Sequence, residues 1–184
     1  MLDPFWNPPP NGSNGVPEAT RALWALVNAV NWEETRSVLT ERQAILLTDR
    51  ALTLLRIIIE NLSAQNEIAE AENWSQYLPL LEEASAYGID GAWSNFISTQ
   101  NKAIDALETL INAAGNDEKL VVLEREQALL IGSTTARVIL RGSISKQREQ
   151  HDEELAEYLE KLLLLLEDAQ ISGIPPAWNR YKAL

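Results

Sequence analysis

The sequence predicts an all-α protein, built as two related helical units in tandem that share a long central helix. Three observations favour this architecture. Apolar residues recur at helical spacing over most of the chain after residue 16. A joint between two helices occurs twice, and the stretches in front of each joint match in the same order. We therefore expect an irregular lead-in over residues 1–16, a first unit over 17–98 and a second unit over 99–184.

The repeated joint is the stretch Leu80–Trp93, LLEEASAYGIDGAW, which returns as Leu165–Trp178, LLEDAQISGIPPAW. An apolar helix that runs into a glycine, here Gly88, is typical of a Schellman ending with the glycine in the left-handed conformation. A new helix is expected two or three residues later. Asp90 is its expected N-cap in the first copy, and Pro175–Pro176 starts it in the second.

The first unit is expected to contain four helices. Pro17 suits the first position of a helix, and Asn31 followed by Glu34 fits a capping box. The Ile57–Ile59 run also allows a strand, but its long periodic context favours a helix. Pro79 is expected to kink or split the fourth helix near residues 76–78. These helices cover about 17–30, 31–41, 49–62 and 66–87.

The second unit begins inside the long helix expected over about 92–114. Ala22–Leu47 aligns with Ala106–Ile131 at an offset of 84 residues, and the glycines of the two joints lie 85 apart. We therefore expect one inserted residue, between the third and fourth helices. Gly142 is expected to shorten or fray the helix that contains it. Further helices are expected over about 134–144, 147–172 and 177–184, and the last resembles the start of another long helix.

Composition and charge exclude several classes of function. The net charge of −12 disfavours a surface for nucleic acid or an anionic membrane, because both need clustered Lys and Arg. The chain has no Cys, which rules out disulfides and thiolate metal sites. The N-terminus lacks the basic and apolar regions of a signal peptide, and the longest aliphatic run, Leu162–Leu166, is too short to span a bilayer. We expect a soluble, cytoplasmic protein.

Catalytic and cofactor motifs are missing from the sequence. The single histidine, His151, lies among acidic residues and has neither a second His nor a Cys with which to build a site. There is no nucleophile elbow, no Glu-x-x-His pair and no glycine-rich phosphate loop. We therefore expect no enzymatic activity, no catalytic or metal-binding residues and no cofactor.

Six tryptophans are the remaining unusual feature. Four fall on apolar stripes and are expected in the core: Trp24, Trp74, Trp93 and Trp178. Trp32 stands at a helix start, and its counterpart in the second copy is Asn116, so the fold does not need an aromatic ring at that position. Trp6 precedes a segment rich in proline and glycine, and either packs back onto the first unit or docks on a partner. Trp6 and Trp32 are therefore the candidate partner contacts.

These patterns also resemble a known group of repeats. Trp32-Glu33-Glu34 after an apolar helix, the Leu46–Thr48 step and the Leu-Leu…Gly-Ile…Ala-Trp ending are similar to the long helical, TPR-like repeats of large bacterial proteins. Such repeats are common in cyanobacteria and actinobacteria, often ahead of a caspase-like CHAT domain. The second copy departs from the pattern, because Asn116-Asp117-Glu118 lacks the Trp. The period near 84 is also far from the 34 or so residues of a true TPR.

The resemblance implies an interaction or regulatory module whose catalysis, if any, lies elsewhere in a parent protein. No caspase-like His/Cys pair exists here, so no protease activity is carried over. We expect a non-enzymatic protein–protein interaction or scaffolding module that is the N-terminal part of a larger bacterial protein and binds a protein or peptide. The alternatives are a stand-alone structural protein that homodimerises, and a small-ligand binder or cryptic enzyme.

Overall fold

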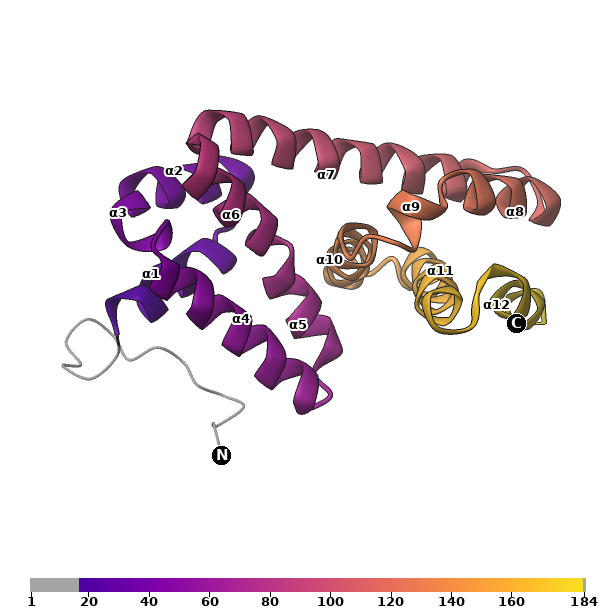
Figure 1. Cartoon of the computed structure of the whole chain (residues 1–184). Coiled ribbons are helices and arrows are strands. Elements are labelled where there is room, and N and C mark those ends of the chain that lie inside the picture. The colour runs from indigo at the N-terminus through magenta and orange to yellow at the C-terminus, as the bar shows by residue number, and fades with distance from the viewer. Residues whose placement is uncertain (1–16, 184) are drawn as a thin grey trace. The chain divides into compact units, whose positions relative to one another are not determined.

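The computed structural model describes residues 17–183, and every regular element among them is an α-helix (Figure 1). The all-α class is thus confirmed for this part of the chain. The predicted lead-in over residues 1–16, which includes Trp6, lies outside the described residues. The helices are α1 (Glu18–Val27), α2 (Trp32–Glu41), α3 (Gln43–Leu46), α4 (Asp49–Ala64), α5 (Ile68–Ser75), α6 (Tyr77–Tyr87), α7 (Ile89–Asn112), α8 (Asn116–Arg125), α9 (Gln127–Leu130), α10 (Thr135–Glu149), α11 (Glu153–Ser172) and α12 (Ile174–Tyr181).

The chain divides into two compact units, and the division falls between Trp93 and Ser94, within α7. We call the part up to Trp93 unit 1 and the part from Ser94 unit 2. The boundary expected from the sequence, between residues 98 and 99, falls in the same helix.

The first two helices begin at the predicted signals. Pro17 is the N-cap of α1, with φ −54°, and the helix starts one residue later than expected. At α2 the Asn31 Oδ1 atom accepts a hydrogen bond of 2.9 Å from the Glu34 N–H, which confirms the predicted cap. The Glu34 carboxylate in turn accepts a hydrogen bond of 2.7 Å from the Val30 N–H. In an ordinary capping box this carboxylate accepts from the N–H of the N-cap residue. Here it accepts from the N–H of the residue before the N-cap.

The four-residue helices α3 and α9 were not predicted. A single turn is too short to show apolar periodicity, and each of these turns is fixed by one leucine. Leu46 in α3 and Leu130 in α9 have no exposed surface. Local sequence cannot reveal such a turn, because it forms to bury one side chain.

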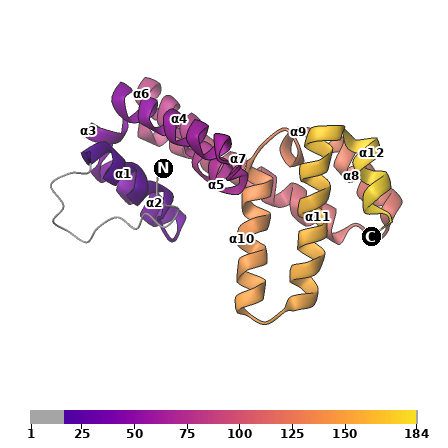
Figure 2. The same ribbon diagram turned by 90° about the horizontal axis from the view of Figure 1, so that it is seen from below.

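Two helical hairpins have turns of the same conformation. α4 packs on α5 and α10 packs on α11 (Figure 2). Asn66 and His151 have φ of +62° and +61°, a conformation that Asn and His tolerate better than most residues. The N–H of the following residue reaches back five residues, from Glu67 to the Leu62 carbonyl at 2.9 Å and from Asp152 to Gln147 at 3.0 Å. These turns are Schellman endings.

The prediction for the helix around Gly142 was wrong. α10 runs unbroken through Gly142 to Glu149, and it is 15 residues long against 16 for α4. The chain turns at Gln150–Asp152 rather than between residues 144 and 147. A single helical glycine costs only about 1 kcal/mol relative to alanine, less than the packing of α10 on α11 can offset.

Pro79 splits the helix as predicted. α5 ends at Ser75, α6 begins at Tyr77, and Gln76 separates them. A proline has no N–H to donate and its ring clashes with the carbonyl four residues earlier, which here belongs to Ser75. α11 contains no proline and continues through 20 residues.

The two glycine joints were predicted only in part. Gly88 and Gly173 have φ of +94° and +84°, but their ψ values are 160° and 163°. The left-handed helical conformation needs ψ near +47°, so the expected Schellman ending is wrong here. The next helix begins at once, at Ile89 or Ile174. Asp90 is therefore not an N-cap; it lies in the first turn of α7 and pairs with Arg36 at 3.0 Å.

Each unit has a core of aliphatic side chains. In unit 2 the core is formed by the later part of α7 and by α8 to α12. Arg137 is fully buried within it and donates a hydrogen bond of 3.0 Å from Nη1 to the Ile131 carbonyl. Among the most deeply buried core residues are Leu23, Leu26, Leu39, Leu55 and Leu81 in unit 1, and Leu110, Leu123, Leu140, Leu162 and Leu166 in unit 2.

Candidate partner-contact surface

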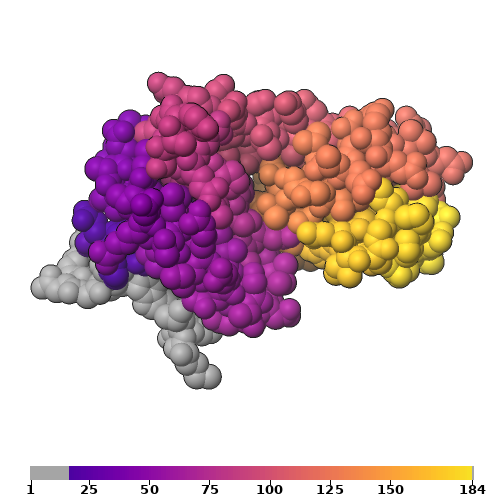
Figure 3. All heavy atoms as spheres, in the orientation of Figure 1, coloured from indigo at the N-terminus to yellow at the C-terminus, as the bar shows by residue number. Residues whose placement is uncertain are grey.

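The structure places one of the two candidate partner contacts. Trp32 is the first residue of α2 and is 39% exposed, and Val30 before it is 88% exposed. We call Val30 and Trp32, with the turn between α1 and α2 that carries them, the α1–α2 corner. In the space-filling view, α1 and α2 have the indigo to violet colours at the start of the described chain (Figure 3). The other candidate, Trp6, lies outside the described residues.

Hydrogen bonds at both helix ends fix the conformation of this corner. α1 stops after Val27, and the Asn28 side chain donates a hydrogen bond of 2.9 Å to the Trp24 carbonyl. The Asn31 cap and the Glu34 carboxylate then fix the start of α2. The side chains of Thr35 and Leu39, farther along the face of α2 that carries Trp32, are buried. Trp32 thus stands where the buried face of α2 meets solvent.

The turn before α8 shares one of these hydrogen bonds and has no aromatic residue. The Ala114 N–H donates to the Glu118 carboxylate at 2.7 Å, as Val30 does to Glu34. Gly115 is the N-cap, and Asn116 takes the place that Trp32 has in α2. The backbone conformation therefore does not require a tryptophan at this position.

The tryptophans expected in the core are buried to different extents. Trp74 and Trp178 are 1% and 4% exposed, which confirms them as core residues. Trp24 and Trp93 are only half-buried. Trp24 packs edge-on against Trp74 with ring centroids 5.2 Å apart. The Trp74 indole N–H donates to the Glu70 carboxylate at 2.9 Å, so this buried ring has its polar atom satisfied.

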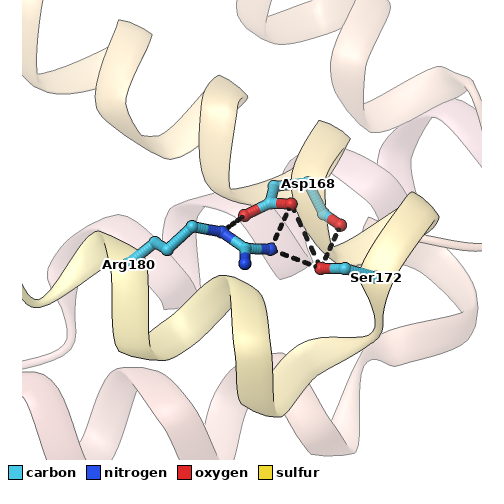
Figure 4. A network of polar contacts seen from close by, with 3 residues as sticks. All are labelled: Asp168, Ser172 and Arg180. Atoms are coloured by element: carbon cyan, nitrogen blue, oxygen red, sulfur yellow. Dashed lines mark hydrogen bonds and ion pairs between the residues drawn. The ribbon is translucent and has the colours of Figure 1, made fainter.

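A polar network that the sequence did not predict fastens α12 to α11 (Figure 4). Arg180 binds Asp168 through both ends of the carboxylate, with Nε–Oδ2 at 2.5 Å and Nη2–Oδ1 at 2.6 Å. The Ser172 hydroxyl lies 2.7 Å from Arg180 Nη2 and donates to the Asp168 carbonyl at 2.9 Å. The hydrogen bond from Arg180 lowers the pKa of Asp168, against a smaller opposing effect of desolvation. This network positions a helix and carries no catalytic group pair.

Groups suited to chemistry are dispersed over the described residues. His151 is exposed in the α10–α11 turn, where its backbone conformation matters more than its ring. No cluster of three or more His, Asp or Glu side chains with metal-binding geometry occurs between residues 17 and 183. Among the same residues, no helix is both long and apolar enough to cross a bilayer.

No family model, curated protein or solved structure matched the chain. The likeness to TPR-like bacterial repeats is therefore supported only as far as the all-helical class. The α1–α2 corner is the candidate site that remains, and it is defined by its geometry alone.

Proposed function

We propose that the protein is a tandem duplication of one helical unit that serves as a non-enzymatic protein–protein interaction module. Four structural features recur at matching offsets and support the duplication. The first is the carboxylate that accepts an N–H four residues earlier, Glu34 from Val30 and Glu118 from Ala114. The second is an ion pair, Arg56–Glu82 at 2.5 Å and Arg141–Glu167 at 2.6 Å. The third and fourth are the positive-φ turns at Asn66 and His151 and the glycine joints at Gly88 and Gly173.

The recurring features also locate the inserted residue. α3 and α9 lie 84 residues apart, whereas the two ion pairs lie 85 apart. Under the proposed duplication, the added residue therefore lies in the second copy between residues 130 and 141, the positions that match 46 and 56 of the first copy.

Exposed apolar residues support an interaction role. Under the proposed duplication, buried leucines occupy equivalent positions in the two units, as Leu39 and Leu123 do. The large exposed apolar residues instead have smaller or polar residues at the equivalent positions. The pairs are Val30 with Ala114, Trp32 with Asn116, Ile57 with Gly142, Ile68 with Glu153, Tyr87 with Ser172, Val121 with Ser37, Leu164 with Pro79 and Ile171 with Ala86.

Trp32 is the single observation that carries the proposed partner site. Tryptophan is among the residues most enriched at the energetic centres of protein interfaces. Trp32 is exposed beside Val30 on a corner that hydrogen bonds hold in shape, so little ordering is needed on binding. Trp6 remains the second proposed contact. The partner is a protein or peptide, and the chain is proposed to act within a larger cytoplasmic bacterial protein.

The test exchanges the paired residues of the two copies. Trp32→Asn gives unit 1 the residue that unit 2 carries, and Asn116→Ala is the matched control. A photo-crosslinking amino acid at the exposed position 33, beside an intact Trp32, identifies the bound protein in the source cells, which is then purified and its Kd measured. We expect Trp32→Asn to weaken binding about 30-fold, for a loss of about 2 kcal/mol, with the melting temperature within a few degrees of the parent. Equal affinity of parent and Trp32→Asn for the captured protein contradicts the proposal, as does unfolding of the variant.

Homodimerisation is the alternative, and light scattering separates it from the module. A monomer across the micromolar range agrees with the proposed module, whereas a dimer whose mass does not depend on concentration favours the stand-alone structural protein. Crosslinks from position 33 that reach only a second copy of the chain favour the same alternative. A small-ligand binder or an enzyme has no observation in its favour among the described residues.

A further inference from the structure

We propose that the far half of the α4–α5 hairpin is a second binding surface, which takes a cationic amphipathic helix from a partner. Figure 1 shows the two helices side by side, joined by a tight turn. The apolar residues of this surface, which we call the hairpin face, are Ile57, Ile58, Leu62 and Ile68. None of them belongs to the α1–α2 corner, so the second surface does not depend on the first.

α4 leaves the core of unit 1 before the helix ends. Its buried positions stop at Leu55, although the helix continues for about two more turns. Beyond that point Ile57 and Ile68 are 46% and 47% exposed, and Ile58 and Leu62 are half-buried. The end of the hairpin therefore keeps apolar surface that the core of unit 1 does not cover.

The α4 residues of the hairpin face lie on one side of the helix. Ile58 and Leu62 are four residues apart, which places their side chains one above the other. The half-buried Leu54 lies three residues before Ile57 and four before Ile58, and so extends the same side toward the core. Apolar residues at this spacing form a stripe on which the apolar side of another helix packs.

The hairpin of unit 2 has the same turn conformation but lacks this face. The backbone at His151 repeats that at Asn66, in φ and in the hydrogen bond that reaches back five residues. The turn conformation alone therefore does not account for the four apolar residues. Under the proposed duplication, their places are taken by Gly142 for Ile57, Ser143 for Ile58, Gln147 for Leu62 and Glu153 for Ile68.

The stretch that carries the hairpin face is acidic, and this favours one kind of occupant. Residues 57–70 contain Glu60, Glu67 and Glu70, all of them exposed, and no Lys, Arg or His. A second copy of the chain would bring these carboxylates against their own like, and an anionic membrane would repel them. A helix with Leu or Ile along one side and Lys or Arg beside it complements both the apolar residues and the charge.

A synthetic peptide of about 14 residues, with leucine on one side of a helix and lysine on the other, is the probe. It is titrated into the full chain carrying ¹³C-labelled isoleucine δ1-methyl groups. We expect the Ile57, Ile58 and Ile68 signals to shift, and the Ile139 and Ile144 signals of α10 to stay in place. A scrambled peptide of the same composition and a leucine–glutamate peptide are expected to bind at least about tenfold more weakly.

Two double variants test the apolar part of the surface. Ile57→Ser/Ile68→Ser is expected to weaken binding of the leucine–lysine peptide about tenfold, with the melting temperature within a few degrees of the parent. The matched control, Val121→Ser/Leu164→Ser, removes two residues of 57% and 55% exposure from unit 2. We expect this control to leave the Kd within about twofold of the parent.

Two further double variants test the charge. Glu60→Gln/Glu67→Gln is expected to weaken peptide binding about threefold and to lessen its dependence on salt. Glu149→Gln/Glu154→Gln removes two exposed carboxylates from the hairpin of unit 2 and is expected to change neither.

Equal affinity of the parent and Ile57→Ser/Ile68→Ser for the peptide overturns the proposal, as does equal binding of the scrambled peptide. Shifts of the same isoleucine signals that follow protein concentration without peptide also overturn it, because the face then packs on a second copy. Trp32→Asn is expected to leave the peptide Kd unchanged, which separates this surface from the α1–α2 corner. A weaker Kd in Trp32→Asn would move the contact to the corner and overturn the hairpin face.

Discussion

Replacing Gly88 with alanine tests whether the joint between α6 and α7 depends on backbone conformation alone. Gly88 has φ +94° and ψ 160°, a region that is open essentially only to glycine. An added Cβ would meet no heavy atom within 4 Å. The cost of the substitution is therefore strain without a steric clash, about 1–3 kcal/mol. Gly173→Ala, with φ +84° and equally open surroundings, is expected to cost a similar amount in unit 2.

Gly91→Ala provides the control, three residues farther along the chain. Gly91 lies within α7, has ordinary helical φ, and an added Cβ there would likewise meet nothing within 4 Å. Alanine in a helix interior is about 0.5–1 kcal/mol more favourable than glycine. The two substitutions add the same methyl group to neighbouring positions, yet their effects on stability are expected to have opposite signs.

Urea unfolding followed by circular dichroism at 222 nm measures the difference. We expect the midpoint to fall in Gly88→Ala and to rise in Gly91→Ala, with the denaturant slope unchanged. The two variants should differ by about 1.5–4 kcal/mol. A loss below about 0.5 kcal/mol in Gly88→Ala would show that the joint adopts another conformation. A comparable loss in Gly91→Ala would show that the start of α7 is not helical.

Two further predictions concern the dependence of stability on pH. The pKa of Asp168 is lowered from 3.8, chiefly by its hydrogen bond from Arg180, so the associated stability is present above pH 4 and is lost as the pH falls below that value. Arg180→Met is expected to make acid unfolding between pH 4 and pH 2 less steep, and an unchanged acid limb would contradict this pair. Burial raises the pKa of Tyr77 from 10.0 to about 12, so the stability it provides is present below pH 10 and is lost as the pH rises toward 12. The absorbance change at 295 nm near pH 12 should be smaller in Tyr77→Phe than in the parent by the contribution of one tyrosine, and an equal change in both proteins assigns the late titration to another residue such as Tyr181, whose pKa burial also raises.

Local signals predicted the parts of the fold that depend on neighbouring residues. The Asn31 cap and the break before Pro79 arise within four residues of the amino acid that causes them. The turns at Asn66 and His151 have the hydrogen bonds expected at the glycines, but neither turn contains a glycine to indicate them. The sequence correctly indicated a positive φ at Gly88 but not its ψ of 160°. That angle depends on the start of α7 at the very next residue.

Features that need tertiary contacts were beyond sequence reasoning. The Arg180–Asp168 pair forms because the chain reverses at Gly173 and brings together residues 12 apart. Arg137 occupies a buried core position, and no local pattern distinguishes it from a surface arginine. The candidate contact at Trp32 stays a prediction. It rests on comparing the two halves of the chain, in which Asn116 stands where the proposed duplication would place a second tryptophan.

The proposed duplication makes each unit a control for the other, and this is why Trp32 carries more weight than exposure alone would give it. Exposed apolar residues are common on soluble proteins, and 39% exposure of one ring would ordinarily call for no explanation. Here a similar turn occurs with Asn116 in place of the tryptophan, and the hydrogen bond from Val30 to Glu34 has its counterpart from Ala114 to Glu118. An aromatic residue retained on a corner that can be built without it gains nothing from the backbone. We therefore propose that this residue contributes through the surface of a partner that packs against it.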